Sequence, residues 1–239
     1  MLFRSIAWSV NSISHNLIHN PYFSSDVLNH LFSLLLSLTL GFSQVMYPLV
    51  HNRHHSGNMD RPDADGNTID FISIYKHGTG GAPENAFKYF LMSYFRDDPV
   101  AIYKAIKARQ PVEAKWAVAE IVSVVALYGA LALYDWRAVL CLLPFYWLGH
   151  SLSAVNGYYE HYRANPDQPI AWGVSSYNKL YNWTWMNNGY HAEHHHRGAT
   201  HVRPPTPPPA AAPSPQVELV KQGDKVVDRK STRLNSSHV

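Results

Sequence analysis

Long apolar segments with almost no charge constrain this chain more than any other feature. Residues 31–50 and 138–159 hold no Asp, Glu, Lys or Arg, and residues 116–134 hold only Glu120. At 1.5 Å of rise per residue, about twenty such residues span a hydrocarbon core roughly 30 Å thick. Each segment therefore predicts a helix that crosses a membrane. Together they predict an all-α, integral-membrane helical bundle.

The order of these segments predicts a topology. Only residues 135–137 separate the second and third segments, so the two should form a hairpin whose ends return to one side of the membrane. Residues 51–115 precede that hairpin and carry nine Lys and Arg, whereas the hairpin tip carries only Arg137. The positive-inside rule then places this stretch in the cytoplasm, as a cap on the bundle. Within it, residues 84–96 have aromatic side chains at helical spacing, which predicts an amphipathic helix at the membrane interface.

Histidine is the unusual component of the sequence, with 15 residues in 239. Two copies of an HxxHH pattern occur, as HNRHH from His51 and HAEHH from His191. An HxxxH pattern begins at His15, and His161 lies in NGYYEHY. On a helix, positions i, i+3 and i+4 share one face, so each pattern would present its imidazoles to one point.

Neutral imidazole is a common protein ligand for transition metals. Nine ligands are too many for one tetrahedral zinc ion and suit two ions with open positions. The nine candidates are His15, His19, His51, His54, His55, His161, His191, His194 and His195. The other six histidines, His30, His77, His150, His196, His201 and His238, have no such pattern and are expected to be ordinary core or surface residues.

Other kinds of site are poorly supported by the sequence. Cys141 is the only cysteine, which excludes an internal disulfide, a cysteine-based zinc site and a cysteine-ligated iron–sulfur cluster. HExxH and GxGxxG are both absent, so neither a zincin protease nor a flavin or nicotinamide site is indicated. The net charge of +3 is small, and no basic cluster suggests a nucleic-acid partner.

The histidine patterns resemble those of the integral-membrane fatty acid desaturase and alkane hydroxylase superfamily, from about His15 to His201. HNRHH has the desaturase spacing, and NNGYHAEHHHR resembles bacterial members described as desaturases. NGYYEHY is instead similar to a hydroxylase motif whose histidine binds iron. Hydroxylases usually have a glutamate after the first histidine, where this chain has Asn16.

The resemblance implies a membrane di-iron enzyme that uses O2 to introduce a double bond into a fatty acyl or lipid chain. It puts the nine histidines in ligand roles, with Asn156, Glu160, Asn188 and Glu193 as candidates to orient them. Electrons would come from a ferredoxin, a rubredoxin or a cytochrome b5-like protein. Candidate docking residues for this donor are Arg53, Arg61, Lys76, Arg163 and Arg197.

Three alternatives stay open at this point. An alkane or fatty acid hydroxylase would use the same nine ligands, because the histidines alone do not separate the two outcomes. A membrane protein that binds or transports metal belongs to a different class, and an inactive fragment to a third.

The predicted topology contains one conflict. A full crossing by residues 31–50 would put His19 and His51 on opposite faces of the membrane. Either residues 20–30 recross part of the membrane after Pro21, or residues 31–50 lie obliquely.

The composition predicts three parts along the chain. Residues 1–203 should form the desaturase-like membrane domain, and family members usually carry further helices before the first histidine pattern, which predicts an N-terminally truncated, metagenomic fragment. Residues 204–227 are rich in Pro and Ala, which predicts a disordered tail. Residues 228–239 resemble the translation of a sequencing-library adapter, so we expect them to be foreign to the natural chain.

Overall fold

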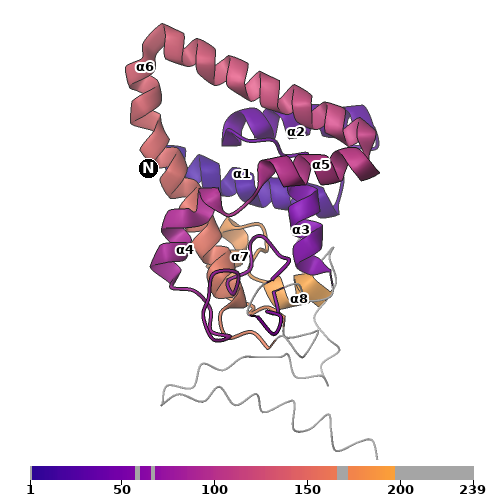
Figure 1. Ribbon diagram of the computed structural model, residues 1–239. Helices are drawn as coiled ribbons and strands as arrows, with labels where there is room; N and C mark the ends of the chain where they lie inside the picture. Colours follow the sequence, from indigo (N-terminus) through magenta and orange to yellow (C-terminus); the bar gives the residue numbers. More distant parts are fainter. Residues whose placement is uncertain (1, 57–59, 66–67, 166–171, 197–239) are drawn as a thin grey trace, which may run out of the picture.

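The fold is helical in every part that the structure describes. The computed structural model describes residues 2–56, 60–65, 68–165 and 172–196, and these form helices with no strand (Figure 1). The all-α class predicted from the sequence is therefore confirmed. The predicted tail segments, residues 204–227 and 228–239, lie outside the described residues.

Two helices form the N-terminal pair. α1 (Leu2–His19) carries the HxxxH pattern in its last two turns, and α2 (Asp26–Leu40) follows after a short connection. α2 ends at Gly41, whose φ of +80° is a left-handed conformation and whose N–H donates to the Ser37 carbonyl at 2.8 Å. Glycine adopts this φ without steric cost, so it ends the helix here despite the apolar residues on both sides.

The predicted single helix over residues 31–50 is therefore wrong. α2 ends at Leu40, residues 41–46 reverse the chain, and α3 (Tyr47–His55) begins after them. This reversal returns the second histidine pattern to the same end of the molecule as the first, where His15 Nε2 lies 3.0 Å from His51 Nε2. The conflict between a full crossing and a common site is thereby removed.

The second and third apolar segments belong to α6 (Pro111–His161), which turns sharply at Asp135 (Figure 1). Asp135 has φ −152° and ψ 89°, and its Oδ1 accepts hydrogen bonds from the backbone N–H groups of Arg137 and Ala138 at 3.0 and 3.3 Å. It thus acts as an N-cap for the second arm. Among the described residues, α6 is the one helix long and apolar enough to cross a membrane.

Glu120, the single charged residue in the first arm of α6, is fully buried. Its two carboxylate oxygens accept hydrogen bonds from Ser33 Oγ at 2.6 Å, Ser43 Oγ at 2.7 Å and the Val45 backbone N–H at 3.0 Å. One side chain therefore joins α6 to α2 and to the 41–46 reversal. Because Val45 lies two residues before α3, Glu120 also determines where the second histidine pattern begins.

We expect Glu120→Leu to lower the free energy of unfolding by about 3 kcal/mol or more, because it leaves three buried donors unpaired at roughly 1–3 kcal/mol each. Glu113→Gln, on the same arm but one-third exposed, should change stability little. Thermal unfolding of the purified proteins followed by circular dichroism measures both effects. Equal stability of the Glu120→Leu variant and the parent would contradict the assigned role.

The remaining helices build the end of the molecule below the two arms. α4 (Ala86–Met92) and the 3-10 turn η1 (Ser93–Phe95) cover the predicted amphipathic segment, with Phe87 and Phe95 exposed and Tyr89 buried. α5 (Pro99–Arg109) packs Ile102 and Ile106 against Val50 of α3 and Ala114 of α6. The short helices α7 (Lys179–Thr184) and α8 (His191–His196) lie beside the end of α6 (Figure 1).

Candidate metal centre

All nine candidate histidines meet at one end of the helical assembly. α1 supplies His15 and His19 from its C-terminal turns, and the last residue of α6 is His161. α3 and α8 each carry three histidines at positions i, i+3 and i+4, but the prediction that each pattern meets at one point is wrong, because each is divided between two groups. Two groups result, and within each group one ring nitrogen per residue lies within 4.8 Å of the others. The five-histidine group comprises His15, His19, His51, His55 and His194, and the four-histidine group comprises His54, His161, His191 and His195.

The Nε2 atoms face inward in both groups. In the five-histidine group, His51 Nε2 lies 3.0 Å from His15 Nε2 and 2.7 Å from His19 Nε2. In the four-histidine group, His161 Nε2 lies 2.9 Å from the Nε2 atoms of both His54 and His191. Two nitrogens that bind one ion at about 2.1 Å and at right angles lie about 3.0 Å apart. The observed separations thus match those of neighbouring ligands on one metal ion.

The two groups lie directly beside each other. The ring centroids of His55 and His195, one from each group, are 4.2 Å apart and the rings are stacked. His54 and His55 are adjacent in sequence on α3 yet contribute to different groups, because consecutive positions on a helix point in different directions. The HxxHH spacing therefore serves both groups at once.

Three carboxylates contact the Nδ1 atoms of the four-histidine group. Asp70 Oδ2 lies 2.6 Å from His54 Nδ1, and Asp60 Oδ2 lies 3.6 Å from His161 Nδ1. Glu160 Oε2 lies 3.4 Å from His191 Nδ1. The contact of Asp70 with His54 is a hydrogen bond, and a carboxylate that accepts from Nδ1–H fixes the ring and keeps its proton there, so that Nε2 offers a lone pair to a metal.

This arrangement fits a bound cation better than it fits an empty polar core. His54 Nδ1–H donates to Asp70, so the His54 lone pair points from Nε2 toward His161 Nε2, 2.9 Å away. Both ring nitrogens of His195 are buried without a hydrogen-bond partner among the described residues. Converging lone pairs repel one another unless a cation lies between them.

Burial and the neighbouring charges set the protonation of these imidazoles. Burial lowers the pKa of His19 to about 4. Burial and the surrounding histidines hold the pKa of His51 well below its usual value. Burial alone would lower the pKa of His54, but the Asp70 carboxylate outweighs it and raises that pKa. Neutral rings are the form that binds metal, so His19 and His51 are ready to bind at neutral pH.

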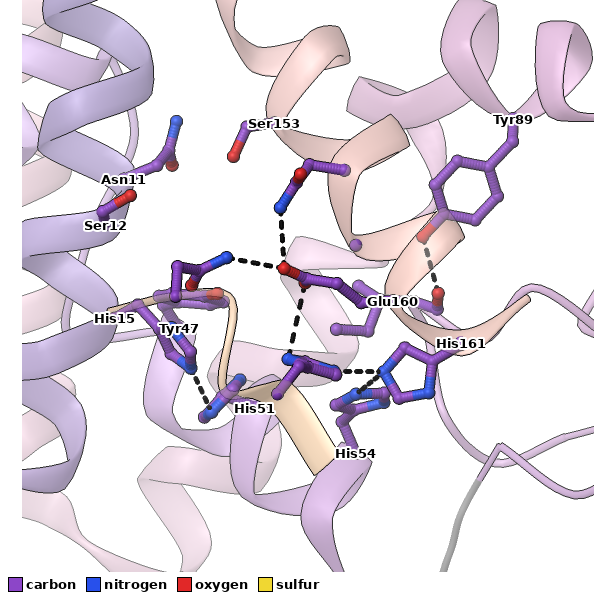
Figure 2. Close-up of a pocket in the computed structure, with 15 residues that line it drawn as sticks. Asn11, Ser12, His15, Tyr47, His51, His54, Tyr89, Ser153, Glu160 and His161 are labelled. Atoms are coloured by element: carbon purple, nitrogen blue, oxygen red, sulfur yellow. Dashed lines mark hydrogen bonds and ion pairs between the residues drawn. The ribbon is translucent and has the colours of Figure 1, made fainter. Parts of the chain in front are cut away.

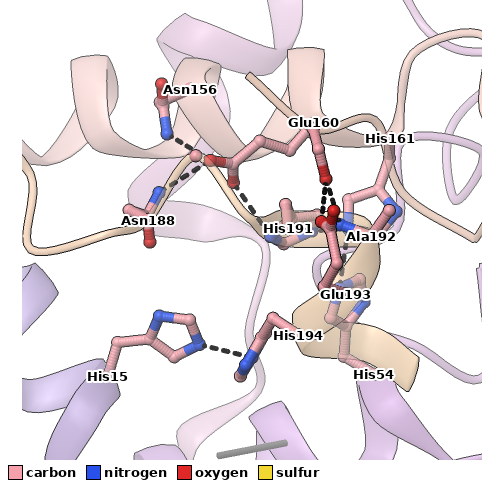
Figure 3. Close-up of polar contacts among 12 residues, drawn as sticks. His15, His54, Asn156, Glu160, His161, Asn188, His191, Ala192, Glu193 and His194 are labelled. Atoms are coloured by element: carbon pink, nitrogen blue, oxygen red, sulfur yellow. Dashed lines mark hydrogen bonds and ion pairs between the residues drawn. The ribbon is translucent and has the colours of Figure 1, made fainter. Parts of the chain in front are cut away.

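Glu160 connects the four-histidine group to a hydrogen-bond network (Figure 3). Its Oε1 accepts from Asn156 Nδ2 at 2.8 Å and from Asn188 Nδ2 at 2.6 Å, while Tyr181 OH donates to Asn156 Oδ1 at 2.8 Å. Three of the four residues that the sequence offered as orienting groups, Asn156, Glu160 and Asn188, thus lie together beside His191.

The fourth, Glu193, accepts hydrogen bonds from Ser175 Oγ and Tyr177 OH, both at 2.5 Å, and ties α8 to the segment before α7. A second contact positions α8 from its N-terminal side. A Cβ atom on Gly189 would lie 2.5 Å from the Ser176 carbonyl oxygen, so only glycine allows this approach. Together these contacts place the third histidine pattern against the other two.

Sequence reasoning did not find Asp60 and Asp70. Both lie in the irregular stretch between α3 and α4, where no periodicity marks which side chain points inward. The stretch is held by buried polar contacts: Ser73 Oγ donates to the Asp60 carbonyl at 3.2 Å, and Arg96 pairs with Glu84 at 2.7 Å. Arg96 Nη2 also donates to the Ser73 carbonyl at 2.6 Å, which anchors the stretch to the end of η1.

The histidines outside these sequence patterns belong to neither histidine group in the part of the chain that the structure describes. His30 stacks on Trp116, and its Nε2 lies 3.0 Å from Glu113 Oε2. His77 is exposed, and His150 packs against Tyr94 and Phe42. His196 ends α8 outside both groups, while His201 and His238 lie outside the described residues.

We expect Asp70→Asn to weaken metal binding at the four-histidine group by about 10–100-fold, the usual cost of losing a partner that orients a ligand. The amide preserves the shape of Asp70 but removes the charge and the strong acceptor for His54. Asp65→Asn, an exposed change in the same stretch, is the matched control. Competitive titration with Co²⁺ measures the affinity, and an unchanged affinity in Asp70→Asn would show that Asp70 does not support the site.

Together, the apolar kinked helix and the paired histidine groups define a helical membrane protein with a centre that fits metal ions. The comparison with protein families agrees, because the family model for fatty acid desaturase matches residues 1–203. The chain therefore belongs to the fatty acid desaturase family, and membership identifies it as an oxidoreductase of the membrane. Searches of curated proteins and of solved structures found no match.

Proposed function

We propose that this chain is an O2-dependent desaturase that inserts a double bond into a fatty acyl or lipid chain, with two iron ions held by the nine histidines. The observation that carries the proposal is the pair of adjoining histidine groups in a chain of the desaturase family. An unactivated methylene C–H bond is too strong for acid–base side chains, and metal-activated oxygen is the chemistry that breaks it.

In this mechanism the side chains of the chain bind and orient rather than react. His54, His161 and His191 would hold one ion from three different elements. Asp70 accepts a hydrogen bond from His54 Nδ1, and Asp60 and Glu160 lie near the Nδ1 atoms of the other two rings. His51 and His55, on the same helix as His54, would hold the other ion. Iron supplies the oxidation when it is bound. The two histidine groups would hold the two ions side by side, in a centre whose imidazoles are mostly buried.

Electrons must come from outside the chain, since the sequence offers no redox cofactor site of its own. We place the histidine end in the cytoplasm, where the basic residues of the 51–115 stretch also lie. Arg61 and Arg163 are exposed near this end and suit the docking of an acidic ferredoxin, rubredoxin or cytochrome b5-like donor. Arg53 and Lys76 both lie over the ring of Phe71, at 5.0 and 4.9 Å, and Arg197 lies outside the described residues.

A hydroxylase is the second candidate, and the NGYYEHY sequence around His161 favours it. Both reactions begin with removal of one hydrogen and differ in whether oxygen then joins the carbon. A metal transporter fits less well, because transporters place their ligands within membrane-spanning helices. Here six of the nine ligands lie on the short helices α3 and α8, His161 is the last residue of α6, and His15 and His19 lie in the last two turns of α1.

A labelled substrate separates the two reactions. The iron-loaded protein in membranes is supplied with a reductant, isotopically labelled dioxygen and a saturated acyl chain deuterated at neighbouring carbons. We expect an alkene that has lost two deuterium atoms and gained no oxygen, measured by mass spectrometry. A labelled alcohol as the main product would overturn the desaturase proposal in favour of the hydroxylase.

A further inference from the structure

A cavity of about 110 Å³ touches both histidine groups. It lies between α1, α3 and the second arm of α6, and Figure 2 shows His15 and His51 on one side of it and His54 and His161 on another. A substrate carbon that reaches both ions has to enter this cavity. About 10–15 Å³ of this kind of volume holds one water, so the cavity has room for several water-sized groups. It therefore accommodates the reacting carbon and its neighbours.

The wall of this cavity exposes about as much polar as apolar surface. Beyond the histidines and two tyrosines, its lining side chains are hydroxyls, amides and one carboxylate, and Ile72 is the only aliphatic side chain among the lining residues that the structure describes. Ser12 of α1 and Ser153 of α6 lie across the cavity from His51 and His54 (Figure 2). Asn156 and Asn188 line the wall near Glu160.

Part of this wall is fixed in place before any ligand binds. Tyr181 holds the Asn156 amide from one side, and Glu160 holds both Asn156 and Asn188 from the other, through hydrogen bonds of 2.6–2.8 Å. An amide fixed in this way keeps its free N–H and carbonyl positions pointing in set directions. Such preorganisation favours a ligand with matching polar groups, because little ordering is left to lose on binding.

A plain methylene chain matches only the apolar part of this wall. It would displace water from hydroxyls and amides without replacing the hydrogen bonds, and polar groups buried without a partner oppose binding. The chain has ample apolar surface elsewhere: Val125 and Leu133 on the first arm of α6 are 67% and 92% exposed. The polar character is thus a local property of the space beside the histidines.

We propose that the substrate of this enzyme is a hydroxyl-bearing lipid chain, with its hydroxyl within a few atoms of the carbon that is oxidised. The structure assigns Ser12 and Ser153 as the residues that bind this hydroxyl, with the Asn156 amide beside them. A hydroxyl both donates and accepts, which matches a wall of serine hydroxyls and amides. This inference rests on the proposed function only in taking the cavity as the place where the substrate meets the ions.

Binding to a zinc-loaded protein tests the proposal without turnover, because zinc has no redox chemistry. Labelled stearate is bound to the protein in nanodiscs and displaced by unlabelled stearate or by hydroxystearates with the hydroxyl at successive carbons. We expect at least one hydroxystearate to bind about tenfold more tightly than stearate, the effect of one or two good hydrogen bonds. Stearate binding as tightly as every hydroxystearate would overturn the proposal.

Variants identify the residues responsible. Ser12→Ala combined with Ser153→Ala should reduce the preference for hydroxystearate over stearate to less than about twofold, while stearate binding is kept. Ser153→Thr keeps a hydroxyl and should keep the preference. The matched control is Ser151→Ala, which lies on α6 like Ser153. The Ser151 hydroxyl is hydrogen-bonded to Ser93 outside the cavity. A preference that survives in the double variant would exclude these serines as the hydroxyl site.

The outcome is independent of the reaction assignment. A hydroxystearate preference in a protein that produces neither alkene nor alcohol would leave the subsite standing and remove the proposed function. Turnover of a plain saturated chain, with no preference between stearate and hydroxystearate, would support the proposed function and remove the subsite. Zinc content per chain, measured on each variant, confirms that the histidine groups are intact before binding is compared.

Discussion

His54→Ala and His194→Ala should each remove one ion and abolish turnover. His54 belongs to the four-histidine group and His194 to the five-histidine group, and both side chains are buried. Replacing a buried imidazole by a methyl group leaves the ion with an open position and its remaining ligands without their anchor. Loss of a residue that orients a metal ligand already lowers metal affinity about 10–100-fold. Loss of a ligand itself should therefore lower it more than about 100-fold.

Metal analysis of the purified variants distinguishes the two sites. The parent loaded with Fe²⁺ should contain two ions per chain, and each single variant should contain one. The controls are His30→Ala and His77→Ala, whose side chains lie outside both groups and which should keep full iron content and activity. If His54→Ala kept two ions and full activity, the ligand assignment would be wrong.

Part of the histidine centre could be anticipated from the sequence, because helical periodicity brings the three histidines of one pattern close together. His51, His54 and His55 share a helix face by spacing, and so do His191, His194 and His195. The division between the two groups could not be anticipated in the same way. It depends on how α3 and α8 are rotated against each other, which side-chain packing decides.

Asp60 and Asp70 show where sequence reasoning stopped. Their carboxylates reach His161 and His54 across 101 and 16 residues of chain, from a stretch with no regular structure. The path of that stretch is set by Arg96 and Glu84, which pair in a buried position more than ten residues further on. Such contacts leave no periodic mark in the sequence.

The error over residues 31–50 has a different physical origin. Mean hydropathy predicts that a segment is apolar, but not that it is one helix. Gly41 permits the left-handed end of α2, and the Glu120 carboxylate from a distant helix holds the reversal that follows. The first signal was visible in the sequence as a glycine after an apolar run. The second depended on a tertiary contact.

Removal of both metal ions should lower the melting temperature by roughly 15–30 °C. Each ion present at about a thousand times its dissociation constant contributes about 4 kcal/mol of stability, and 1 kcal/mol corresponds to about 2–4 °C in a chain of this size. Without the ions, ring nitrogens face each other at 2.7–3.1 Å in a buried centre, and the lone pairs of pairs that share no proton repel each other. Their repulsion then opposes the packing of α1, α3, α6 and α8 instead of supporting it.

Chelation followed by reloading measures this contribution. The melting temperature should return on addition of Fe²⁺, Co²⁺ or Zn²⁺, which bind imidazole, and not on addition of Mg²⁺ or Ca²⁺, which prefer oxygen ligands. His54→Ala combined with His194→Ala should melt near the temperature of the metal-free parent and respond little to any of the five ions. A melting temperature that chelation leaves unchanged, or that Mg²⁺ restores as well as Fe²⁺, would show that the histidine groups are a polar core and not a metal centre.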